Sequence, residues 1–301
     1  MPLLLTTAQA LSNNMLERGV IETIIDRDDM LAFLPFSQIN GKALVYNREN
    51  SLSGADWLSP NATVNESASD VTELTATLRI IAGDVDVDKF LSTTMNDSNN
   101  QTAIQIASKA KAVARMFHAA VANGSVAGNP NSFDGLPNLV DRNYSISAGT
   151  NGNAVSLSML DELKDAVILG ADAFVMRREV WRQIKGLLRS MGGTRADQIE
   201  VPNFGQPVPA FDGVPVLLND FLSNTEKMGS NNNTSSIYAV RFNEADGLHG
   251  IYGGPNAGIV VEDIGTVQNK DANRIRLKWY VSLVLKSNRS LAAIRGVSVA
   301  S

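Results

Sequence analysis

The 301-residue chain contains no cysteine, which excludes disulfide bonds and thiolate metal sites. Histidine is nearly absent, and neither His118 nor His249 has around it the spacing of a metal or catalytic motif. The sequence also lacks a phosphate loop, a dinucleotide-binding glycine pattern and a nucleophile elbow. No apolar run is long enough to span a membrane. We therefore expect a protein that is not an enzyme and needs no cofactor or metal.

Composition places the chain among soluble globular proteins. Hydrophobic residues make up 44% and charged residues 19%, and the length suffices for one elaborate domain or two. The net charge of −5 does not favour binding to free nucleic acid. A protein kept in a reducing cytoplasm, or assembled there, fits these properties.

Basic residues are missing from one long stretch. There is no lysine or arginine from Glu49 to Leu78. Alternating strands at 43–48 and 72–82 flank a connection rich in serine, asparagine and other turn-forming residues. A two-stranded ribbon is only marginally stable alone, and long connections inside compact domains are uncommon. The pattern predicts an arm that becomes ordered on a neighbouring subunit.

Charge suggests where such an arm would dock. Its acidic residues would be steered onto a basic surface. Trp57 and Leu58 near the tip are either ordinary exposed residues or anchors that bury in the neighbour. The acidic residues are Glu49, Asp56, Glu66, Asp70 and Glu73. The candidate basic partners are Lys109, Lys111 and Arg115 on one helix and Arg177, Arg178 and Arg182 on another.

The remaining pattern predicts mixed helix and strand. An alanine-rich helix is expected over 101–122, a second over 177–191, and a long strand over 275–286. Residues 230–236 resemble a polar surface turn. Residues 83–88 form a strand with three aspartates on one face, which indicates either a calcium site or an edge facing solvent or a cationic partner. Two similar turns, Phe133-Asp-Gly-Leu-Pro137 and Phe211-Asp-Gly-Val-Pro215, are expected to be independent.

Taken in order, these elements resemble the major capsid protein of tailed bacteriophages, with the Hong Kong 97-type α+β fold. The resemblance rests on element order and loose turn motifs, including the terminal Leu291-Ala-Ala-Ile-Arg-Gly296. It implies an N-terminal arm (1–40), an extended hairpin loop (41–85), a peripheral domain with a long spine helix and a β-sheet (86–155), an α/β axial domain (156–265) and a return to the peripheral domain (266–301).

The resemblance also implies partners. Copies would form hexamers and pentamers of an icosahedral shell around phage double-stranded DNA, assembled in the host cytoplasm, and DNA would be enclosed without sequence-specific binding. A separate scaffolding protein, a portal and decoration proteins would be expected, and no membrane. The lysine that cross-links the prototype shell has no counterpart, because no lysine lies between Lys42 and Lys89. Two alternatives stay open: an encapsulin-type nanocompartment shell, and a soluble enzyme or binding module whose long loop is a lid.

Overall fold

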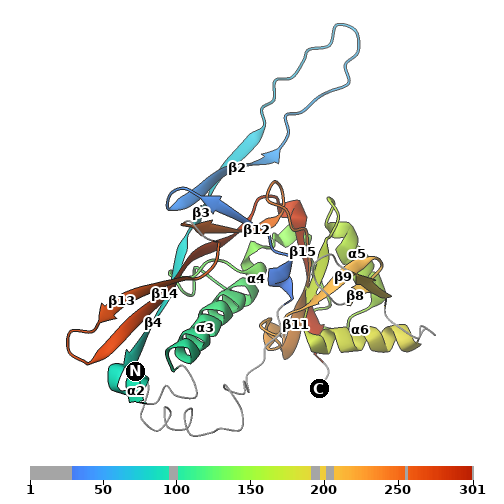
Figure 1. Ribbon diagram of the computed structural model, residues 1–301. Coiled ribbons are helices and arrows are strands. Elements are labelled where there is room, and N and C mark those ends of the chain that lie inside the picture. The colour runs from blue at the N-terminus through green and yellow to red at the C-terminus, as the bar shows by residue number, and fades with distance from the viewer. Residues whose placement is uncertain (1–28, 95–100, 191–196, 201–206, 255–256, 300–301) are drawn as a thin grey trace.

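The computed structural model describes residues 29–94, 101–190, 197–200, 207–254 and 257–299. Two β-sheets form the body, and a two-stranded ribbon projects away from it (Figure 1). The expected N-terminal arm lies mostly outside the described residues.

The first sheet is built around the longest strand. β14 (Ala272–Leu285) pairs antiparallel with β4 (Arg79–Asp88) on one edge, and with β12 (Leu248–Gly253) and β13 (Val260–Thr266) over successive stretches. β1 (Phe36–Ile39) adds parallel to β12. The strand predicted over 275–286 is therefore confirmed, with its alternate apolar residues facing the core.

The helix predicted over 101–122 is also confirmed, as α3 (Gln101–Asn123). It packs on the first sheet (Figure 1). Val113, Phe117 and Val121 are buried on its apolar stripe. The Phe117 ring lies 4.7 Å from Trp279 of β14, 5.5 Å from Phe133 and 6.1 Å from Phe36, measured between centroids.

The second sheet has eight strands, in the order β5-β15-β11-β6-β9-β8-β7 with β10 paired to β11. Their bounds are β5 Ser145–Ser147, β6 Ala173–Met176, β7 Asp197–Glu200, β8 Pro207–Phe211, β9 Val214–Leu218, β10 Glu226–Met228, β11 Asn231–Val240 and β15 Leu291–Ser298. The helices α5 (Leu157–Ala166) and α6 (Arg178–Ser190) pack against this sheet. Short elements complete the chain: η1 Met30–Ala32, α2 Lys89–Thr94, α4 Leu136–Leu139, η2 Arg142–Tyr144 and η3 Asn288–Ser290.

The two sheets share one core. One face of the second sheet, which includes Val175, Tyr238 and Ala293, belongs to the same buried cluster as Phe117 and Trp279. The other face packs with residues of α5 and α6 in a separate cluster. A continuous core resists relative movement of its parts, because interiors are close-packed. The body should therefore behave as one unit, and the arm is the element that stands apart.

The arm is shorter at its base than the sequence suggests. β2 (Ala43–Ser51) pairs with β3 (Asp70–Thr77), which confirms the hairpin. The strand expected over 72–82, however, is two strands. The chain leaves the arm at Leu78, whose backbone N–H donates to Lys42 O, and β4 then joins the first sheet. Alternation alone could not show this change of partner, because both strands have the same period.

The prediction of a surface turn over residues 230–236 was wrong. Residues 230–236 are not a surface turn, since β11 begins at Asn231 and buries Thr234 and Ser236. Their hydroxyls are satisfied by Glu226, with Thr234 donating to its carbonyl at 2.7 Å and Ser236 to its carboxylate at 2.5 Å.

The two Phe-Asp-Gly turns are independent, as predicted. Asp212 and Gly213 both have positive φ, which makes the tight hairpin turn between β8 and β9. Gly135 instead packs against the end of α3, where a Cβ would lie 2.4 Å from Ala120 O. The same Phe-Asp-Gly sequence therefore forms a hairpin turn in one place and a close contact between a loop and a helix in the other.

Candidate assembly interfaces

The base of the arm is fixed to the body by its own side chains. Tyr46 Oη donates to Leu285 O at 3.0 Å. Arg48 donates from Nε to Lys286 O at 2.8 Å and from Nη2 to Leu285 O at 2.6 Å. Burial raises the pKa of Tyr46, and the nearby Arg48 only partly offsets this. These bonds engage the carbonyls where β14 ends and hold the ribbon at a defined angle.

The apex, residues 52–69, lies far from the body (Figure 1) and every one of its residues is exposed. Trp57 is fully exposed and Leu52 and Val64 are more than two-thirds exposed. Local bonds shape the loop, with Asn65 Nδ2 donating to Asp56 at 3.2 Å and Ser67 Oγ to Gly54 O at 3.0 Å. A shaped loop that exposes tryptophan is typical of a surface that a partner covers.

The candidate cations of α3 all contact other residues of their own subunit. Lys109 lies over Gly83, where a Cβ would come within 3.1 Å of its side chain. The guanidinium of Arg115 sits over the Phe221 ring, 5.6 Å from its centroid. Lys111 is exposed on the helix surface and also has an interaction within the chain.

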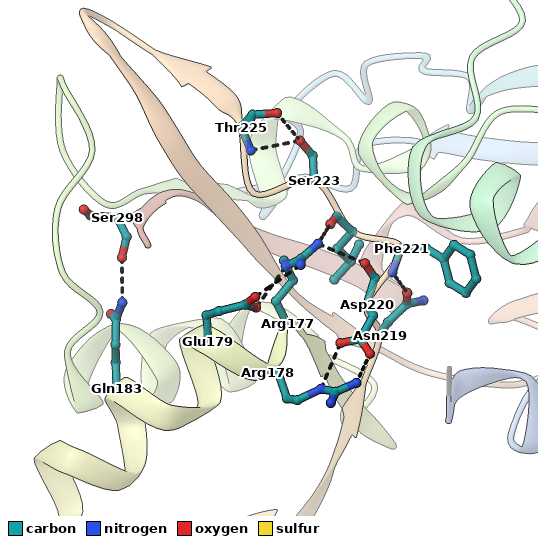
Figure 2. A network of polar contacts seen from close by, with 11 residues as sticks. Arg177, Arg178, Glu179, Gln183, Asn219, Asp220, Phe221, Ser223, Thr225 and Ser298 are labelled. Carbon is teal, nitrogen blue, oxygen red and sulfur yellow. Dashed lines mark hydrogen bonds and ion pairs between the residues drawn. The ribbon is translucent and has the colours of Figure 1, made fainter. Parts of the chain in front are cut away.

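The candidate cations at the start of α6 lie in a polar network (Figure 2). Arg177 donates to Glu179 at 3.0 Å and to Asp220 O at 2.9 Å, and also to the Leu222 carbonyl. Arg178 donates from Nε to the Asp220 carboxylate at 3.1 Å. Hydrogen bonds from Arg177 lower the pKa of Glu179.

This network gives Arg177 a structural role, since its side chain is only 15% exposed. Arg178 keeps 56% of its side chain exposed, and Arg182 lies exposed on the same helix with an interaction of its own. Sequence spacing could not reveal these pairings, because Asp220 is 42 residues from Arg178 along the chain.

The aspartates of β4 face cations of their own chain. Asp86 accepts two bonds from Arg274 at 2.6 and 2.8 Å, and Asp84 accepts two from Arg276 at 2.7 and 2.8 Å. These residues are directly opposite one another in the β4–β14 register. The cationic partner expected for this strand is thus β14. Hydrogen bonds from the arginines lower the pKa of both Asp84 and Asp86.

These lowered pKa values predict acid sensitivity. A carboxyl group with a lower pKa in the folded state stabilises the fold above its unfolded pKa, and this stabilisation is lost as the pH falls through the folded value. The double variant Asp84→Asn/Asp86→Asn should therefore melt below the parent protein at pH 7, and the gap should narrow below the ordinary aspartate pKa near 3.8. Thermal melts at pH 7 and pH 3 measure this gap. Glu162→Gln, at an exposed residue of α5, is the control. A difference in melting temperature at pH 3 as large as that at pH 7 would contradict the linkage.

One cation that the sequence did not single out stands at the root of the arm. Arg79 is the first residue of β4, and its Nε is buried without a hydrogen-bond partner among the described residues. It lines a groove of about 400 Å³ between the arm and the body. Its place just after the acidic stretch was visible in the sequence, but its orientation depends on the β4–β14 register.

The described residues contain neither a membrane-spanning helix nor a metal-binding cluster of side chains. None of these helices is both long and apolar enough to cross a bilayer. Within the same residues, no group of three or more histidine, aspartate or glutamate side chains is arranged to hold a metal ion.

Comparison with known proteins gives no sequence relative: neither a protein-family model nor a curated protein matches the chain. Solved structures match it along its length. The encapsulin of the holo-SrpI complex from Synechococcus elongatus PCC 7942 has a TM-score of 0.77 at 18% identity, covering 100% of this chain and 98% of that one. The capsid of an empty GTA particle has a TM-score of 0.68 at 14% identity, covering 95% of each. The cyanophage A-1(L) capsid has a TM-score of 0.68 at 12% identity, covering 94% of this chain and 96% of that one.

These likenesses show that the chain has the Hong Kong 97-type capsid fold, which confirms the fold class expected from the sequence. At such low identity they show the fold alone, and the same fold occurs here in phage capsids and in an encapsulin.

Proposed function

We propose that this protein is the repeating subunit of a closed shell, and specifically the major capsid protein of a tailed phage. The arm carries the proposal: it exposes Trp57 and further apolar side chains at a distance from the body, where only another molecule can cover them. Most of the solved shells with this fold named above are capsids.

In this function the arm docks on a second copy, and copies associate into hexamers and pentamers of an icosahedral shell that encloses double-stranded DNA. A separate scaffolding protein, a portal and decoration proteins are further proposed partners. The virion, assembled in the host cytoplasm, is the proposed location. Lys109, Lys111, Arg115, Arg178 and Arg182 remain candidate contacts for the acidic arm. Arg177, whose side chain is only 15% exposed, is the weakest of the six.

A second candidate is the shell of an encapsulin nanocompartment. The specific observation in its favour is the TM-score of 0.77 to the holo-SrpI encapsulin over 100% of this chain. Both candidates are shell proteins, so they differ in what the shell contains and not in how the subunit works. A lid-bearing enzyme of another class would be a monomer.

Electron microscopy of the purified protein, alone and with candidate scaffold proteins, tests the shell function. We expect closed shells or rings of six and five subunits. Nuclease-protected double-stranded DNA inside particles from the native source would support a capsid, and packaged protein cargo would support a nanocompartment. A persistent monomer whose melting temperature shifts with a small ligand would overturn the shell function.

A further inference from the structure

The groove at the root of the arm is lined by both apolar and polar side chains and by the cation Arg79. Its apolar lining comes from Tyr46 and Leu74 of the ribbon and from Phe133, Leu139, Leu283 and Leu285 of the body. Its volume of about 400 Å³ suits a few side chains of an inserted segment.

Arg79 gives this groove its chemical preference. β4 residues of the same parity, Ile81 and Val85, are buried against the core, so Arg79 points toward the same side. Its buried Nε donor lacks a partner among the described residues. Buried donors in folded proteins are nearly always paired, and a guanidinium pairs best with a carboxylate. Asp134 also lines the groove, but its carboxylate accepts from the Val126 backbone N–H at 2.9 Å. Arg79 is only partly buried, so a carboxylate supplied from outside can pair with its guanidinium.

We propose that the groove receives the arm apex of a second copy, with the Asp56 carboxylate pairing with Arg79 and the apolar side chains of Trp57 and Leu58 covering the groove walls. The proposal rests on the shell function and names the receptor of its arm. Between Glu49 and Leu78 the arm has acidic residues and no basic ones, so its charge complements Arg79. Asp56 is followed directly by two large apolar residues, whereas Glu66 has asparagine and serine beside it.

The apex cannot reach the groove of its own subunit. The ribbon pairs from Ala43↔Thr77 to Ser51↔Asp70, which holds the apex about nine residues, or roughly 30 Å, from the root. Each copy thus offers an apex at one end and a receptor at the other. Such a contact is heterologous, and it closes into rings when the rotation between copies allows. Arg79 then completes its pairing only in the assembled state.

Charge exchange tests the pairing. Arg79→Glu and Asp56→Arg should each lower the yield of assembled particles by roughly tenfold or more, because each places like charges together. The double variant Arg79→Glu/Asp56→Arg should restore assembly. Two controls accompany it. Lys227→Glu reverses an exposed charge on β10, which is not a candidate contact of the arm, and Arg79→Glu/Glu66→Arg should not restore assembly. Thermal melts verify that each subunit is folded.

Asp56→Arg keeps the test decisive if Arg79→Glu fails to fold, because Asp56 lies on an exposed loop. Normal particle yield from Asp56→Arg, or a double variant no better than the singles, would overturn the proposal. Absence of particles from the parent protein would instead overturn the shell function, so the two failures are distinguishable.

The absence of cysteine allows a second measurement. Leu58→Cys combined with Thr75→Cys, an exposed residue lining the groove, should form intersubunit disulfides in oxidised particles. A ladder of covalent oligomers on a non-reducing gel is expected. Leu58→Cys with Lys227→Cys, on the exposed surface of β10, should give none. An equal ladder from both pairs would count against the groove.

Discussion

Replacing Phe117 with alanine is expected to lower the free energy of unfolding by about 3–5 kcal/mol, the usual cost of removing a buried aromatic ring. Phe117 is completely buried, and its ring contacts those of Trp279, Phe133 and Phe36 from three different segments. The cavity would lie between α3 and β14, in the core that the two sheets share. Denaturant unfolding of the subunit before assembly measures the loss.

The neighbouring residue provides a matched control. Met116 lies on the same helix but is 62% exposed, so Met116→Ala should change the free energy of unfolding by no more than about 0.5 kcal/mol. Phe117→Leu should fall between the two, because leucine retains part of the buried volume. Equal costs for Phe117→Ala and Met116→Ala would show that the core is not centred on this ring.

Phe117 also illustrates what the sequence could predict. The apolar residues of α3 recur at helical spacing and those of β14 alternate, so burial on one side leaves a readable period in each. The hairpin was readable for the same reason, together with its unusually polar connection. Local periodicity was therefore enough to predict these helices and strands, and their order along the chain suggested the Hong Kong 97-type fold.

The sequence could not predict which residues pair with the charged side chains. Whether Arg177 faces solvent or Asp220 depends on how α6 meets a loop some forty residues later, and Asp86 meets Arg274 only through the β4–β14 register. Charge counts treated all six candidate cations alike. The structure gives several of them partners within their own chain. Arg79, which was not among the six, has a buried Nε donor without a partner among the described residues.

β11 shows a related limit. Its first residues are polar, which is typical of a turn, yet they form a strand because Glu226 and the edge of β15 satisfy their polar groups. A polar sequence can occupy a buried strand when the neighbours supply hydrogen bonds. Those neighbours are set by the tertiary fold, so residue type alone gave the wrong result here.

Removing the arm apex is expected to abolish shell assembly while leaving the subunit folded. Ser51 and Asp70 are opposite one another in the ribbon, so an Asn-Gly pair can replace residues 52–69 as a tight hairpin turn. The melting temperature should change little, because every deleted residue is exposed and the bonds of Tyr46 and Arg48 at the root remain. Light scattering and electron microscopy should then show only small species.

A second apex variant distinguishes the effect of the length of the arm from the effect of its apex side chains. Replacing 52–69 with glycine and serine residues of equal number keeps the length of the arm but removes Asp56, Trp57 and Leu58. If side chains of the apex bind the neighbour, this variant should fail to assemble as completely as the deletion. If the arm acts only as a spacer, the glycine–serine variant should assemble and the deletion should not. Normal shells from the deletion itself would mean that the arm is not an assembly element, because an exposed apex that contributes nothing to subunit contacts can be lost without effect.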